Sequence, residues 1–255
     1  MGIGELPPRA GWRTITVTIG IVAALPFEVP SLAHRVRHAE RDGESLLVNI
    51  AGVGAAAARA AGEQLLAQGA RALISWGSAA ALHPSARSGD LVLPICVKAG
   101  NGIEFPVDAQ WRRDLWLALR PGLRIWEEIL LEVSEVIYDP QAKRGLARQH
   151  GAIAADMESA TLARLAAETG AGFLAVRSIC DTVHMRLPAC ASLFAGGDAT
   201  PPWHRVMTEL GRHPRDWPAA VQLWRGLRRA RRTLSQVGVV DQLTCRRDPV
   251  PVLLP

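Results

Sequence analysis

Two carboxylates in the segment 151–181 follow short apolar runs, at a spacing suited to proton-transfer chemistry. Glu158 comes just after the run 151–155, and Asp181 ends the segment that begins at Phe173. In open α/β sheets, ligands bind beyond the carboxyl ends of the strands, and a carboxyl group held there can pass a proton to a bound ligand. The spacing alone leaves an alternative open, in which Glu158 interacts with a helix dipole and Asp181 caps a loop.

A strand, a helix and a second strand are expected to position this pair. Residues 151–155 and 173–176 are apolar enough to form buried strands. Between them, helical spacing predicts one buried face, formed by Leu162, Leu165, Ala166 and Thr169. Gly170 stands where a glycine commonly ends a helix. A right-handed crossover predicts that the two strands run parallel.

The preceding part of the chain alternates strands and helices in the same way. Strands are expected at 14–24, 45–51, 71–75 and 89–94, and an Ala-rich helix follows the second of them. The start of that helix, Gly52-Val53-Gly54, imitates a dinucleotide-binding fingerprint, which also needs an acidic residue at the end of the next strand. The next strand ends at Ser75 instead, which argues against NAD. The pattern predicts a single α/β domain with a central, mixed and mostly parallel sheet flanked by helices.

The residues around the two carboxylates resemble a known superfamily. A-D-M-E-S-A at 155–160 and V-R-S-I-C-D at 176–181 are similar to the motifs of the nucleoside phosphorylase/nucleosidase superfamily, and the likeness spans about residues 16–182. It implies an enzyme that cleaves a purine N-glycosidic bond. Met157 and Glu158 would bind the ribose, Glu158 through the hydroxyls, and Asp181 would donate to N7 of the departing base.

Two further segments resemble motifs that, in this superfamily, lie on the nucleophile side of the ribose. A-A-L-P-F-E-V at 23–29 matches the first-strand motif of hydrolytic members at its last two residues, so Glu28 is the candidate general base. I-S-W-G-S-A-A-A-L at 74–82 resembles a small-residue turn of the family. It implies that Gly77 and Ser78 lie on the nucleophile side of the ribose. A turn that merely packs under a helix stays an alternative.

The base-binding side matches the family less well. Residues 132–138 stand where the family carries S-G-D-x-[FY], which implies that Tyr138 stacks near the base, although the Gly-Asp pair is missing. Cys180, inside the second motif, is assigned to the same side. Residues 99–130 carry Trp111, Trp116 and Trp126, which we expect to pack in the core or to line a substrate channel.

Water and phosphate both stay open as the nucleophile. Phosphorolytic members carry arginines where this chain has Glu28 and Ser75. Arginine is the natural side chain for bidentate binding of phosphate, so hydrolysis without a cofactor or metal is favoured, with phosphate left open as a co-substrate.

The Ala-rich helix, the strand G-D-L-V-L-P and the arginine-rich C-terminal part resemble the hopanoid-biosynthesis-associated phosphorylases. This likeness implies release of adenine from an adenosyl-lipid, adenosylhopane. A phosphate-dependent purine nucleoside phosphorylase and a 5′-methylthioadenosine/S-adenosylhomocysteine nucleosidase are the alternatives.

The composition is typical of a globular enzyme in a reducing compartment. Of the 255 residues 49% are hydrophobic, and no apolar run approaches the ~18 residues of a membrane span. The four cysteines form no C-x-x-C pair, so neither a disulfide framework nor a zinc site is expected. His34 and His38 have no third ligand near them in the sequence. We expect a cytoplasmic, homo-oligomeric protein with a leader over 1–13, a domain over 14–238 and a loose tail over 239–255.

The net charge of +5 is concentrated towards the C-terminus. A helix is expected over 219–237, with arginines on one face and an apolar stripe formed by Val221, Trp224, Leu227 and Leu234. The helix either packs on the sheet or touches an anionic membrane peripherally. A membrane-peripheral lipid-binding protein without catalysis is the non-enzyme alternative. Nucleic-acid binding is not expected, because the chain carries no aromatic-basic RNA motif.

Overall fold

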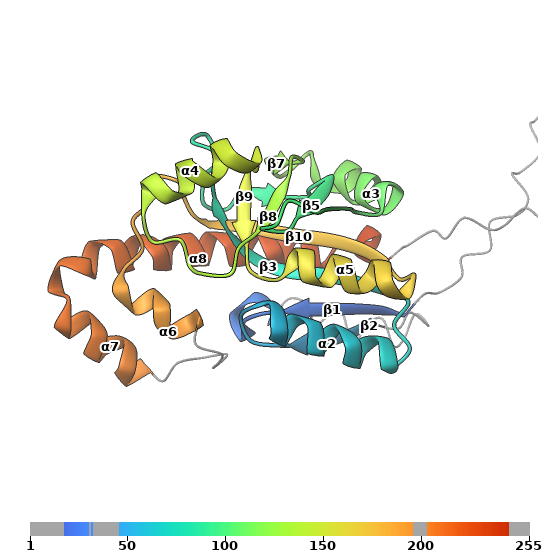
Figure 1. Ribbon diagram of the computed structural model, residues 1–255, viewed down its shortest axis with the longest axis horizontal. Helices are drawn as coiled ribbons and strands as arrows, with labels where there is room; N and C mark the ends of the chain where they lie inside the picture. The colour runs from blue at the N-terminus through green and yellow to red at the C-terminus, as the bar shows by residue number, and fades with distance from the viewer. Residues whose placement is uncertain (1–17, 31, 33–45, 196–202, 245–255) are drawn as a thin grey trace, which may run out of the picture.

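The computed structural model describes residues 18–30, 32, 46–195 and 203–244 (Figure 1). The expected leader, His34, His38 and the end of the expected tail lie outside these residues. The strands are β1 (Ile19–Ala23), β2 (Leu46–Ile50), β3 (Ala72–Ala81), β4 (Leu91–Val92), β5 (Cys96–Lys98), β6 (Glu104–Pro106), β7 (Ile125–Trp126), β8 (Leu130–Glu132), β9 (Ala154–Asp156) and β10 (Gly172–Asp181). The α-helices are α2 (Ala55–Ala67), α3 (Ala109–Leu119), α4 (Pro140–His150), α5 (Ser159–Thr169), α6 (Ser192–Ala195), α7 (Trp203–Arg212) and α8 (Trp217–Gly238). Short 3-10 helices are η1 (Pro26–Glu28), η2 (Ala189–Ala191), η3 (Pro214–Asp216) and η4 (Asp241–Leu243).

One sheet contains all ten strands, and β3 is its central member. Its main path runs β6-β5-β8-β9-β3-β10-β4-β7, with β1 pairing both β2 and β3. Within the described residues, six of the nine strand pairs are parallel and three are antiparallel. The predicted α/β domain with a mixed, mostly parallel sheet is therefore confirmed.

Helices cover both faces of the sheet. Side chains alternate between the two faces along each strand, so apolar residues of the strands form a core cluster on each face. On β1, Val22 belongs to the core cluster shared with α2 and α5, which lie side by side in Figure 1. Its neighbour Ile21 belongs to the opposite cluster, which includes Leu115 of α3 and Leu234 of α8. Trp111 and Trp116 also pack in this second cluster. None of the described helices is both long enough and apolar enough to cross a membrane.

We predicted that the two strands on either side of α5 run parallel, and this prediction is wrong. β3 pairs β10 in parallel and β9 antiparallel, so β9 runs against β10. The register places Ala155 of β9 opposite Ala80, which also pairs Asp181 of β10. The carboxyl end of β9 therefore points back along β3, towards Ser78, and meets the carboxyl end of β10 at one place.

The segment 74–82 forms most of β3 rather than the turn that we expected. Ser75 and Gly77 pair with residues of β10, and Ala81 pairs with β9. Hydrogen-bonding partners on both sides thus keep this small-residue segment extended. A Cβ at Gly77 would lie 2.8 Å from both Arg177 Nη1 and Glu28 Oε2, so the absence of a side chain lets these two groups approach the strand.

Helix α8 packs on the sheet through small residues rather than through the whole predicted stripe. Leu234 is buried, but Val221 and Trp224 are 41% and 55% exposed. A Cβ at Gly226 would lie 1.8 Å from the carbonyl oxygen of Cys180, so only glycine permits this close contact with β10. Beyond α8, Leu243 is buried against the same core cluster as α8, whereas Val239 is exposed.

Candidate active site

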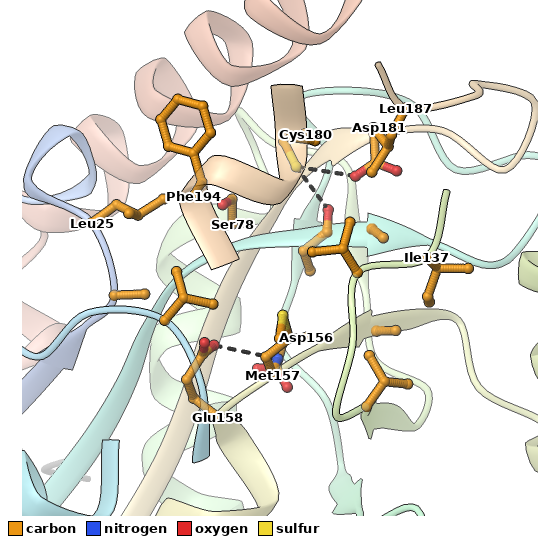
Figure 2. A pocket seen from close by; sticks show the side chains of 18 of the residues that line it. Leu25, Ser78, Ile137, Asp156, Met157, Glu158, Cys180, Asp181, Leu187 and Phe194 are labelled. Atoms are coloured by element: carbon orange, nitrogen blue, oxygen red, sulfur yellow. Dashed lines mark hydrogen bonds between the residues drawn. The ribbon is translucent and has the colours of Figure 1, made fainter. Parts of the chain in front are cut away.

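A pocket of about 170 Å³ opens where β1, β3, β9 and β10 end (Figure 2). Six of the predicted site residues line it, namely Glu28, Ser78, Met157, Glu158, Cys180 and Asp181. Figure 2 shows Glu158 and Met157 at one end of the pocket and Cys180 and Asp181 at the other. The residues predicted from four separate segments are therefore brought to one place.

Glu28 reaches the pocket from η1, directly after β1. Its Oε1 accepts hydrogen bonds from the backbone N–H and the hydroxyl of Ser78, both at 2.8 Å, and its Oε2 accepts from Leu25 N at 3.0 Å. The indole of Trp76 donates to the Glu28 carbonyl oxygen at 2.9 Å. Burial raises the pKa of the Glu28 carboxyl, although the Arg177 guanidinium and the Ser78 hydrogen bonds act in the opposite direction. The carboxyl group is thus fixed in position and is a stronger proton acceptor than an exposed one.

Arg177 of β10 is the cation that links the carboxylates at the Glu158 end of the pocket. Its guanidinium is 2.8 Å from Asp156 Oδ2 and 3.2 Å from Glu158 Oε2, and it also donates to the Ser75 hydroxyl at 2.6 Å. The Ser159 hydroxyl donates to Asp156, and its oxygen also lies 2.9 Å from the Ser75 hydroxyl. Our reading of the motifs gave no role to Arg177 or Asp156, although both stand inside them.

Both carboxylate oxygens of Glu158 accept hydrogen bonds from the protein, and lone pairs remain that could accept hydrogen bonds from a ligand. The backbone N–H of Gly54 donates to Oε1 at 2.9 Å, and Arg177 and the Met157 N–H contact Oε2. Gly54 has a positive φ of 105°, a conformation that glycine adopts at little cost. Burial raises the pKa of Glu158 to about 7, against the attraction of Arg177. The glycine-rich segment before α2 therefore serves this carboxylate rather than a dinucleotide.

Asp181 pairs with a buried lysine that the sequence did not reveal. Lys143 of α4 has no exposed surface, and its ammonium contacts Asp181 Oδ2 and donates to the carbonyl oxygens of Thr182 and Met185. On the other side, the Cys180 thiol lies 3.2 Å from Asp181 Oδ1. Burial, with Asp181 adding to it, raises the pKa of this thiol well above its usual value, so the thiol remains a hydrogen-bond donor.

Two predicted site residues do not line the pocket. Gly77 lies beside it in β3, and its lack of a side chain makes room for Glu28 and Arg177. Tyr138 lines an adjacent hollow instead, while its neighbours Val136 and Ile137 line the pocket. Stacking of Tyr138 on the base stays a prediction.

The described residues contain no group of three or more His, Cys, Asp or Glu side chains arranged to hold a metal ion. Cys96, Cys180 and Cys190 are free thiols. The polar groups that converge on the pocket are carboxylates, hydroxyls and one guanidinium, which can move protons and bind hydroxyl groups.

The fold is similar to that of several solved nucleosidases. The 5′-methylthioadenosine/S-adenosylhomocysteine nucleosidase of Helicobacter pylori aligns at a TM-score of 0.64 with 14% identity, over 87% of this chain and 96% of that one. The futalosine hydrolase of the same organism aligns at 0.66 with 14% identity, over 87% and 95%. The S-adenosylhomocysteine nucleosidase of Streptococcus pyogenes aligns at 0.64 with 14% identity, over 92% and 98%. At such identities these likenesses establish the fold alone.

Sequence comparison identifies the family. A comparison with curated proteins gave no match. The model of the phosphorylase superfamily matches residues 18–189, which is more than half of the chain and includes Glu28 and both motifs around Glu158 and Asp181. The chain therefore belongs to the phosphorylase superfamily and is an enzyme of the class that cleaves glycosyl bonds.

Proposed function

We propose that the enzyme hydrolyses the N-glycosidic bond of a 5′-substituted purine nucleoside and releases adenine. The charge of the pocket carries this proposal. Among the described residues that line it, Arg177 is the only basic side chain, whereas the acidic ones are Glu28, Glu135, Asp156, Glu158 and Asp181. Arg177 is already paired with two of these carboxylates. Phosphate would meet no unpaired cation there, while water would meet a buried carboxylate.

The proposed reaction uses three carboxyl groups in different roles. Breaking the bond builds positive charge on the ribose and negative charge on the base. Glu28 takes a proton from the attacking water, as the base of an inverting glycosidase does. Glu158 accepts hydrogen bonds from the ribose hydroxyls and favours the cationic transition state. Asp181 delivers a proton or a strong hydrogen bond to N7 of the base.

The experiment is adenine release from 5′-methylthioadenosine in phosphate-free buffer. We expect release with the free sugar as the second product, and its loss in Glu28→Gln. Glu63→Gln, on the exposed surface of α2, is the matched control and should keep full activity. Strict dependence on added phosphate, with a sugar 1-phosphate as product, would contradict the proposal and favour a purine nucleoside phosphorylase.

The apolar part of the pocket supports a substrate whose 5′-substituent is apolar. Leu25, Phe194 and Leu223 line it, and Figure 2 shows Phe194 and Leu25 on one side of the pocket, with Leu187 on the other side beside Asp181. Burying a methylthio or alkyl group against such side chains is favourable, at about 25 cal/mol per Å² of apolar surface. Among the candidate substrates, 5′-methylthioadenosine, which a 5′-methylthioadenosine/S-adenosylhomocysteine nucleosidase cleaves, has the smallest 5′-substituent that could contact these apolar side chains.

For the natural substrate we propose the larger member of this class, adenosylhopane, reached at an anionic membrane. Leu223 of α8 lines the pocket, while its neighbour Trp224 is exposed and lies against the Arg228 guanidinium at 4.7 Å. Trp217 and Val221 are exposed on the same helix. Exposed aromatic and apolar side chains flanked by arginines suit contact with an anionic bilayer.

A substrate panel separates the finer candidates. Adenine release from 5′-methylthioadenosine, S-adenosylhomocysteine and a long-chain 5′-alkyl adenosine in vesicles should be compared as kcat/KM. A preference for the long chain supports the adenosyl-lipid, and a preference for the short ones supports the nucleosidase alternative. No release from any of them would favour a lipid-binding protein without catalysis. Light scattering tests our further proposal of a homo-oligomer.

A further inference from the structure

Lys143 is a buried charge close to the pocket to which the proposed reaction gives no role. Its ammonium contacts Asp181 Oδ2, and it lies 3.1 Å from the Thr182 carbonyl oxygen and 3.0 Å from that of Met185. An ammonium has three N–H donors, so each has an acceptor. Burying an ammonium is unfavourable unless it is paired in this way, so these three acceptors are what allow the fold to bury the cation.

The position of Lys143 restricts how it can act. It has no exposed surface and does not line the pocket, whereas Asp181 does. The other group on the Asp181 carboxyl is the Cys180 thiol, at Oδ1. Any effect of Lys143 on a bound nucleoside must therefore pass through Asp181. The contact with Asp181 is an ion pair between a fully buried ammonium and a buried carboxylate.

Resting on the proposed function, we propose that Lys143 is the positioning residue that supplies, through Asp181, the proton that the departing base receives. As the bond from C1′ to the base breaks and its electron pair goes to the base, a proton leaves Lys143 Nζ for the Asp181 carboxyl, which passes a proton to the base nitrogen. Lys143 is left as a neutral amine and Asp181 as a carboxylate. The amine recovers its proton from water after the product leaves.

A merely structural role is the competing explanation, because Lys143 also ties α4 to the segment after β10. Leaving-group dependence distinguishes the two roles. Adenine needs protonation to depart, whereas 4-nitrophenolate departs readily as an anion. Loss of a residue that supplies a proton should slow release of adenine and affect release of 4-nitrophenolate little. Loss of a purely structural residue should slow both.

The test measures kcat and KM of Lys143→Met on 5′-methylthioadenosine and on 4-nitrophenyl β-ribofuranoside. We expect kcat for adenine release to fall about 10²-fold with KM nearly unchanged, and nitrophenol release to fall much less. An equal loss on both substrates, or no loss on adenine release, would overturn the inference. If wild-type enzyme cleaves neither substrate, the proposed function itself fails.

A double variant covers the case in which Lys143→Met does not fold. Lys143→Gln combined with Asp181→Asn replaces the buried ion pair by a neutral hydrogen-bonded pair, which is often tolerated. If the two residues supply one proton as a unit, the double variant loses about as much adenine release as Asp181→Asn alone. A much larger loss in the double variant would mean that Lys143 acts independently, which contradicts the inference.

Discussion

Replacing Glu158 by Gln should make the empty protein more stable in neutral and weakly alkaline solution, although it removes a proposed ribose ligand. Glu158, Asp156 and Glu28 are buried around one cation, Arg177. Three ionised carboxylates would exceed its charge, and burial penalises each of them. Gln keeps the shape of the side chain and carries no charge at any pH.

The pKa of Glu158 sets the size and the sign of the effect. Burial raises that pKa from the ordinary value of 4.5 to about 7, and one pKa unit corresponds to about 1.36 kcal/mol. The native state therefore holds a proton that the unfolded chain has released. The stabilisation from this proton is fully present below pH 4.5 and is lost as the pH rises through 7. The loss is on the order of 3 kcal/mol, and the neighbouring carboxylates share it.

The assay is urea unfolding of wild type and Glu158→Gln at pH 5, 6, 7 and 8. We expect the free energy of unfolding of the variant, relative to wild type, to rise by roughly 1–3 kcal/mol between pH 5 and pH 8. Glu168→Gln is the control, because Glu168 is 46% exposed on α5, and its difference from wild type should not depend on pH. A variant that loses more stability at pH 8 than at pH 5 would show that the pair with Arg177 outweighs burial, and would refute the reasoning.

Three further predictions concern the acid, the contact of α8 with the sheet, and the charged face of α8. Asp181→Asn should reduce adenine release about 10²-fold or more with a folded far-UV spectrum retained, and near-full activity would mean that Asp181, the last residue of β10, is only structural. Gly226→Ala should lower the free energy of unfolding by roughly 1–3 kcal/mol, because its Cβ would meet Cys180 O at 1.8 Å. Gly145→Ala, where a Cβ in α4 meets nothing within 4 Å, should be neutral or stabilising, and equal thermal shifts would contradict this contrast. Changing four exposed arginines of α8 to Gln should weaken sedimentation with anionic vesicles, where each cation contributes ~1 kcal/mol, and should spare turnover of 5′-methylthioadenosine; equal loss on both would make the helix purely structural. These are Arg225, Arg228, Arg229 and Arg232.

The sequence predicted the parts of the site that local patterns encode. The resemblance to the superfamily singled out Glu28, and the expected convergence of Glu28, Glu158 and Asp181 rested on their shared position after or at the end of predicted strands. Lys143 could not be predicted, because it stands on an otherwise polar helix, 38 residues before its partner Asp181. No periodicity marks a single buried lysine.

The remaining errors came from contacts between distant segments. The direction of β9 depends on its pairing with the second half of β3, which the pattern of residues 151–155 does not reveal. The buried face of α8 was misassigned because hydrophobicity favours Trp224, whereas the close approach to β10 requires the small side of the helix at Gly226. In both cases tertiary packing overrides the local preference.

The two ends of the pocket differ in charge, and the difference fits the proposed reaction. At the ribose end, one guanidinium faces three carboxylates, Glu28, Asp156 and Glu158, so negative charge is in excess where the sugar becomes positive. At the base end, one ammonium faces one carboxylate, Asp181, and the pair is neutral with a transferable proton where the base becomes negative. Figure 2 places Glu158 and Asp181 at these opposite ends. Fixed charges of this kind need no reorganisation when the bond breaks. In the proposed reaction, Arg177 limits the repulsion among the carboxylates, and Lys143 supplies the proton that the leaving base needs.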